Sequence, residues 1–130
     1  AVVLHEKMKI FDEEIKLRNE IADYYSENLN EFVQVPEIAD NNISSWAQYS
    51  ILVKIQDRNK LINHLHKNDI PSAVFYRKPF NTLELYPDNN KLDFDISLRL
   101  SQSILSLPMH PYLTKTELDK IIKTIKDYYA

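Results

Sequence analysis

The sequence predicts an α/β (α+β) two-layer sandwich, in which a long N-terminal helix and further helices cover a small sheet. Three observations lead to this prediction. Apolar residues in the first 32 positions recur at alternating steps of four and three, as on one face of a helix. Short runs rich in β-branched and aromatic residues follow, separated by helical patterns. The length of 130 residues suits a single domain, 1–130, and 44% hydrophobic residues can form its core.

The first expected element is one helix over residues 1–32. At about 1.5 Å per residue, such a helix is longer than a compact domain of this size can cover. We therefore expect part of it to pack on a domain outside this chain. The acidic run Asp12-Glu13-Glu14 is expected on its solvated face. Arg18 lies inside the apolar stripe, either as a snorkelling side chain or as part of an ion pair or interface.

The middle of the chain predicts two strands around a helix, and the small domain is expected to span residues 46–130. Residues 46–55 favour a strand, because aromatic and β-branched residues alternate there. The helix that follows has Asp57 as its expected N-cap and Asp69 at a left-handed exit, since no glycine is available. A second strand is expected over residues 72–76, with an apolar run that predicts burial on both faces.

The C-terminal third predicts a further strand and a final helix. Residues 77–92 indicate an irregular segment with a short helical turn at 82–85, and residues 94–102 form a candidate helix. A buried strand is expected at residues 104–107 and a helix at 115–129.

The turn between that strand and the final helix is the most distinctive segment. Pro108 and Pro111 fix φ on either side of His110 and remove two backbone donors, so the strand must end there. Thr114, with Glu117 three residues later, matches a capping box that starts a helix.

The composition excludes several classes of function. The chain contains no glycine, which excludes a Walker loop and a dinucleotide-binding fingerprint. It contains no cysteine, so a disulfide framework and a thiolate site are excluded. A net charge of −3 argues against a nucleic-acid partner. No apolar run reaches the ~18 residues that span a bilayer, so we expect no membrane partner. The lack of cysteine fits a cytoplasmic location, which we therefore expect.

Two segments could carry chemistry. His110 is either a turn histidine bonded to the backbone or a contact to a ligand or partner. The run Tyr76-Arg77-Lys78-Pro79-Phe80 leaves a predicted buried strand, and its cations could meet a phosphate or carboxylate. A structural strand exit with solvated charges is equally compatible. His64 and His66 lie two apart on a predicted helix, so they point to different faces and form a poor metal site.

Four segments in order resemble one family over nearly the whole chain. They are residues 18–29, Ser45-Trp46-Ala47-Gln48-Tyr49-Ser50-Ile51, residues 58–65, and the signature Leu105-Ser106-Leu107-Pro108-Met109-His110-Pro111-Tyr112-Leu113-Thr114. The chain resembles the C-terminal small domain of the DegT/DnrJ/EryC1/StrS sugar aminotransferases, pyridoxal-phosphate enzymes of fold type I. In that family a loop with a conserved histidine reaches toward the active site. By resemblance its histidine falls on Asn81 and its glutamine on Leu83, a departure from the family pattern.

The resemblance implies a fragment of a nucleotide-sugar aminotransferase, which moves an amino group from glutamate to a keto-sugar for polysaccharide or glycan biosynthesis. Tyr76, Asn81 and His110 are its implied cleft-facing, substrate-binding positions. The cofactor lysine belongs to the family's large domain, so this chain alone is expected to bind no pyridoxal phosphate and to be inactive. The implied partners are that large domain, a second copy in a homodimer and a nucleotide sugar. The alternative is a stand-alone binding or regulatory module that kept the fold and lost catalysis.

Overall fold

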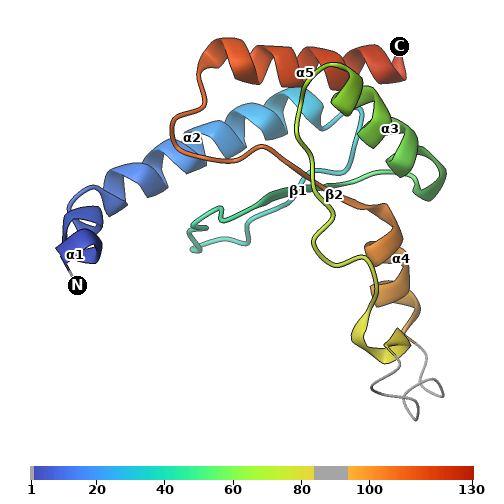
Figure 1. The fold of residues 1–130 in the computed structure, drawn as a ribbon, viewed down its shortest axis with the longest axis horizontal. Helices are drawn as coiled ribbons and strands as arrows, with labels where there is room; N and C mark the ends of the chain where they lie inside the picture. The colour runs from blue at the N-terminus through green and yellow to red at the C-terminus, as the bar shows by residue number, and fades with distance from the viewer. Residues whose placement is uncertain (1, 84–93) are drawn as a thin grey trace.

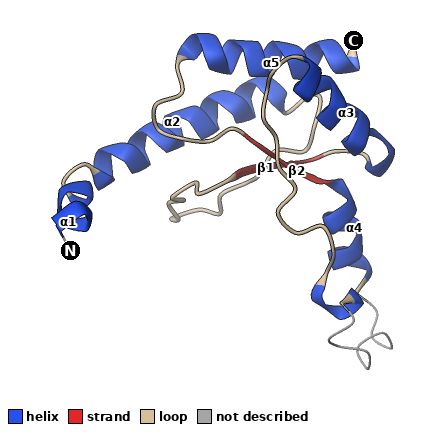
Figure 2. Ribbon diagram, viewed as in Figure 1, coloured by secondary structure: helices blue, strands red, loops and turns tan. Residues whose placement is uncertain are grey.

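The structure is a computed structural model that describes residues 2–83 and 94–130. The described part of the chain contains five α-helices, one two-stranded sheet and one 3-10 helix (Figures 1 and 2). In chain order the elements are α1 Val2–Met8, α2 Phe11–Leu29, β1 Tyr49–Leu52, α3 Ile55–Lys67, η1 Phe80–Thr82, α4 Asp95–Ser103, β2 Ile104–Leu107 and α5 Lys115–Tyr129. The chain is therefore α+β, with helices as its main component.

Strands β1 and β2 pair antiparallel, with Ile51 opposite Leu105 at the centre of the ladder. The second predicted strand, at 72–76, is wrong, because only Ala73 bridges to Ser106. Val74 still packs against the core, but the exposed side chains begin at Phe75, which is 55% exposed. The first predicted strand is also shorter than expected.

The shortening of β1 has a local cause. Trp46 has a φ of 46°, which lies in the left-handed region and prevents an extended strand through that residue. Its indole N–H donates a hydrogen bond to Asn19 Oδ1 at 3.0 Å. Trp46 is therefore buried and bonded to α2, just before the strand begins.

Helices α2, α3 and α5 lie together on one side of β1 and β2, while α4 extends away from them (Figure 1). Helix α5 packs on both α2 and α3, and α3 also contacts α4. The centre of the core contains two stacked tyrosines, Tyr25 and Tyr49, whose ring centroids lie 5.0 Å apart. Around them are other side chains with no exposed surface: Leu29, Ile51, Leu61, Leu65, Leu105 and Ile125.

The predicted helix over residues 1–32 is interrupted, so that prediction is wrong in its continuity. At the end of α1, Lys9 and Ile10 donate their backbone N–H groups three residues back, to Glu6 and Lys7. Such tight bonds close a helix end. Helix α2 then begins at Phe11 with three acidic residues in its first turn, which the helix dipole favours.

The structure tests the predicted N-cap and the predicted left-handed exit of α3. Lys54 occupies the N-cap and Asp57 lies within the first turn, so the predicted N-cap is wrong. Asp69 has a φ of 57°, which confirms the left-handed exit. The predicted turn at 82–85 overlaps η1 at Thr82, and Leu83 is the C-cap of η1. Residues 84–85 and the rest of the irregular segment up to 92 fall outside the described residues.

The N-terminus of α5 has the predicted capping box. The Thr114 hydroxyl accepts a hydrogen bond from Glu117 N at 3.3 Å, and Thr114 N donates to Glu117 Oε2 at 2.8 Å. The backbone and side-chain hydrogen bonds from Thr114 lower the pKa of the Glu117 carboxyl. The charged carboxylate is therefore the form that stabilises the folded chain.

Replacing Thr114 with alanine is expected to lower the free energy of unfolding by about 1 kcal/mol at neutral pH. Since the folded-state pKa of Glu117 is lowered, its contribution is present above the ordinary value of 4.5 and is lost as pH falls through the folded-state value. The difference between Thr114→Ala and the parent should therefore shrink in acid. Chemical denaturation across pH measures it, and a difference that grows in acid contradicts the capping box.

Candidate functional site

An open groove of about 670 Å³ lies in the described part of the chain. It lies between the segment that follows the Ala73 bridge and the inner face of α4. Its lining is mostly aromatic and apolar, with few polar groups: Phe75, Tyr76, Arg77, Lys78, Pro79, Phe80, Leu83, Ser97, Leu100, Ser101 and Ile104. A concave, largely apolar surface of this size suits a small-molecule ligand.

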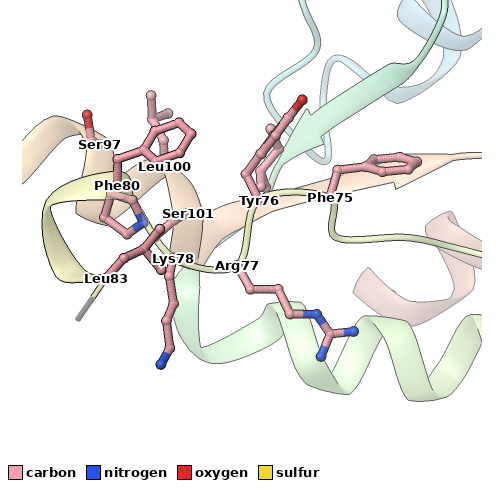
Figure 3. Close-up of a pocket in the computed structure, with 11 residues that line it drawn as sticks. Phe75, Tyr76, Arg77, Lys78, Phe80, Leu83, Ser97, Leu100 and Ser101 are labelled. Atoms are coloured by element: carbon pink, nitrogen blue, oxygen red, sulfur yellow. The ribbon is translucent and has the colours of Figure 1, made fainter. Parts of the chain in front are cut away.

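Figure 3 shows how the side chains divide along this segment. The rings of Tyr76 and Phe80 project to one side, and the charged ends of Arg77 and Lys78 project to the other. Tyr76 is 70% exposed and Phe80 is 75% exposed. Two large rings exposed beside each other form a surface on which a flat or apolar ligand can lie.

Of the three predicted substrate-binding residues, the structure places only Tyr76 in the groove lining. Asn81 lies in η1, half-buried, and is not among the lining residues. His110 lies beyond Leu107, at the other end of β2 from the Ile104 end that lines the groove. Within this chain, then, the three residues do not form one cluster.

His110 is exposed, and its Nδ1 accepts a hydrogen bond from Tyr112 N at 3.3 Å. This is the bond expected of a turn histidine. The turn is also fixed from its other side, because the Tyr25 hydroxyl donates to the Pro108 carbonyl at 3.0 Å. Burial raises the pKa of Tyr25, which keeps this donor neutral.

A second link joins the turn to α2. The Tyr112 hydroxyl donates a hydrogen bond to Glu14 Oε1 at 2.6 Å, and this bond raises the pKa of Tyr112. Glu14 is only 8% exposed and also pairs with Arg18, at 3.6 Å. The prediction that Glu14 lies on a solvated face is therefore wrong, and Arg18 takes the ion-pair alternative.

Sequence reasoning missed the contribution of α4 to the groove. Ser97, Leu100 and Ser101 lie three and four residues apart and share one face of that helix. This spacing indicates that the three residues share a helix face, but it does not indicate which segment that face contacts. No group of three or more possible metal ligands occurs among residues 2–83 and 94–130. No helix in those ranges is long and apolar enough to cross a membrane.

A comparison with known families decides the chain's identity. The profile of the DegT/DnrJ/EryC1/StrS aminotransferase family matches residues 1–126. The chain belongs to the DegT/DnrJ/EryC1/StrS aminotransferase family. The resemblance carried by the Ile104–Thr114 region and by the earlier segments is thereby confirmed.

Two curated relatives of this DegT/DnrJ/EryC1/StrS chain have names that specify nucleotide-linked sugars. It is 36% identical over 123 residues to a UDP-2-acetamido-2-deoxy-3-oxo-D-glucuronate aminotransferase of Pseudomonas aeruginosa, covering 94% of this chain and 33% of that protein. It is 30% identical over 121 residues to a GDP-perosamine synthase of Escherichia coli, covering 92% of this chain and 32% of that protein. The chain thus spans about a third of the length of these relatives.

Solved structures agree with the assignment. A DegT DnrJ EryC1 StrS aminotransferase from Brucella abortus superposes with a TM-score of 0.92 at 39% identity, covering 98% of this chain and 34% of that one. NtdA from Bacillus subtilis, with bound cofactor PMP, superposes with a TM-score of 0.79 at 19% identity, covering 88% of this chain and 28% of that one. The second likeness shows the fold alone.

Proposed function

We propose that this chain is the C-terminal small-domain portion of a pyridoxal-phosphate-dependent aminotransferase that moves an amino group from glutamate to a nucleotide-linked keto-sugar, for polysaccharide or glycan biosynthesis in the cytoplasm. The family match over residues 1–126 carries the proposal. It is supported by relatives of which this chain spans about a third, and whose names specify amino sugars linked to UDP or GDP.

Pyridoxal phosphate is proposed to be held by residues outside this chain. Such a cofactor needs a lysine for its aldehyde and a carboxylate or similar partner for its pyridine nitrogen. Among the described residues that line the groove there is one lysine, Lys78, whose ammonium points away from the aromatic side, and there is no carboxylate. These residues do not fit the cofactor, so by itself the chain is proposed to be inactive.

The N-terminal helices are the proposed contact with the missing large domain. Six apolar side chains on α1 and the start of α2 are between 41% and 77% exposed: Val2, Val3, Leu4, Met8, Ile10 and Phe11. Many exposed apolar side chains in one short segment are typical of an interface. The complete enzyme is proposed to be a homodimer in which residues 46–130 form a two-layer small domain beside the cleft.

Within the complete enzyme, the groove is proposed to close one side of the substrate cleft. Tyr76 would supply a ring against which substrate lies, and Asn81 and His110 are the other proposed contacts. Because they do not meet Tyr76 within this chain, they would touch other parts of a bound nucleotide sugar or of a partner copy.

Replacing Tyr76 with alanine is expected to raise the KM of the complete enzyme for its nucleotide-sugar substrate about two- to tenfold, since an aromatic contact is worth about 0.5–1.5 kcal/mol. Steady-state kinetics at saturating glutamate measures the effect. Tyr76→Phe is the matched control because it keeps the ring, and its KM should stay close to the parent value. If the KM of Tyr76→Ala is unchanged, Tyr76 does not contact the nucleotide-sugar substrate.

A further inference from the structure

A second, smaller hollow lies on the α3 side of the segment that lines the groove. It has a volume of about 200 Å³ between α3 and residues 74–77. Its lining combines two arginines and two asparagines with two aliphatic side chains: Arg58, Asn59, Ile62, Asn63, Val74 and Arg77. Figure 3 shows the Arg77 side chain extending toward α3, on the side opposite to Tyr76.

The described residues give this hollow positive charge and no counter-charge. Among residues 2–83 and 94–130, no acidic side chain lines it and no ion pair involves Arg58 or Arg77. Two guanidinium groups that share one hollow repel each other unless an anion lies between them. A guanidinium presents several N–H donors in a planar fork that matches the oxygens of phosphate or carboxylate.

Arg58 is held in place before any ligand binds. Its Nη1 donates to the Ser101 carbonyl at 2.6 Å, and its Nε donates to Asn59 Oδ1 at 3.4 Å. The second bond leaves the Asn59 amide nitrogen as a further donor, and Asn63 lies one turn along α3 on the same face. The hollow therefore offers a fixed cation, a more exposed cation at Arg77, and neutral donors.

We infer that Arg58, Arg77, Asn59 and Asn63 form a binding site for a phosphate group. The volume is below the range that encloses a whole drug-sized ligand, so the site accepts a small anion or one phosphate of a larger molecule. Arg77 belongs to the groove segment and Arg58 is bonded to α4, which forms the opposite groove wall. A bound phosphate would thus link both walls of the groove to α3.

The site does not depend on the proposed transfer activity, so binding is measured without cofactor or amino donor. Inorganic phosphate is titrated into the full-length protein by calorimetry, at constant ionic strength set with chloride. Saturable binding is expected, and Arg77→Gln should weaken it about tenfold or more, the loss of a charge-assisted bond. Arg58→Gln should do the same. Lys60→Gln, an exposed α3 residue outside the hollow, is the matched control and should leave the affinity unchanged.

Because Arg58 also donates a hydrogen bond to the Ser101 carbonyl, Arg58→Gln can disturb the fold as well as the phosphate site. Arg77 does not make that bond, so the result for Arg77→Gln decides the test. The inference is overturned if Lys60→Gln weakens phosphate binding as much as Arg77→Gln does. It is also overturned if the parent protein shows no saturable phosphate binding. A parallel titration with UDP identifies the source of the phosphate. If the protein binds UDP more tightly than inorganic phosphate, and Arg77→Gln abolishes the UDP binding, the natural ligand is a nucleotide diphosphate. If UDP binds no more tightly than inorganic phosphate, the ligand is free phosphate.

Discussion

Replacing Ile51 with alanine is expected to lower the free energy of unfolding by about 2–5 kcal/mol, the range for an isoleucine removed from a packed core. Ile51 has no exposed surface and lies opposite Leu105 at the centre of the two-stranded sheet. In the described part of the chain the sheet has two strands, so few neighbouring side chains can move in to fill the cavity. Chemical denaturation of the protein that carries the chain measures the loss.

The matched control is Ile43→Ala. Ile43 is 85% exposed, so the same truncation should change the free energy of unfolding by no more than about 0.5 kcal/mol. Similar losses in the two variants would show that Ile51 is not at the centre of the core, and the pairing of β1 with β2 would then be wrong.

Replacing Glu14 with alanine has the second largest expected effect, a loss of about 1–3 kcal/mol in the free energy of unfolding. The change removes the acceptor of the Tyr112 hydroxyl and leaves Arg18, whose side chain is 23% exposed, without its carboxylate. It also removes one of the two links between the proline-rich turn and α2, and the bond from the Tyr25 hydroxyl to the Pro108 carbonyl stays. Thermal and chemical denaturation measure the loss.

Glu13→Ala is the control for this experiment. Glu13 is exposed and lies in the same first turn of α2, so its removal has the same effect on the helix dipole without breaking a buried contact. Its expected cost is below about 1 kcal/mol. Equal costs for the two variants would mean that the Tyr112–Glu14–Arg18 contacts add nothing to the helix-dipole effect.

Features set by neighbouring residues could be predicted from the sequence. The capping box depends on Thr114 and Glu117, three residues apart, and the bounds of β2 and α5 follow from the prolines and apolar steps around them. The left-handed residue Asp69 likewise follows from the local need to end a helix without glycine.

Features that depend on distant partners could not be predicted. Glu14 is buried because Tyr112, 98 positions later, donates to it, and nothing in the acidic run around Glu14 indicates that contact. The run Ala73-Val74-Phe75 has the composition of a buried strand, but only Ala73 finds a partner on β2. The groove could not be predicted because it depends on where α4 lies relative to the Tyr76 segment, which is set by the tertiary structure. Burial and pairing therefore account for most of the wrong predictions.

We propose that this chain completes an aminotransferase whose cofactor lysine lies outside it. Borohydride reduction of the full-length protein with pyridoxal phosphate fixes a pyridoxyl group on the lysine that holds the cofactor, and peptide mass mapping locates it. One labelled lysine is expected, outside these 130 residues. Stoichiometric labelling of a lysine within the chain, such as Lys78, would contradict it, and the absence of any specific label would favour a binding module that has lost catalysis.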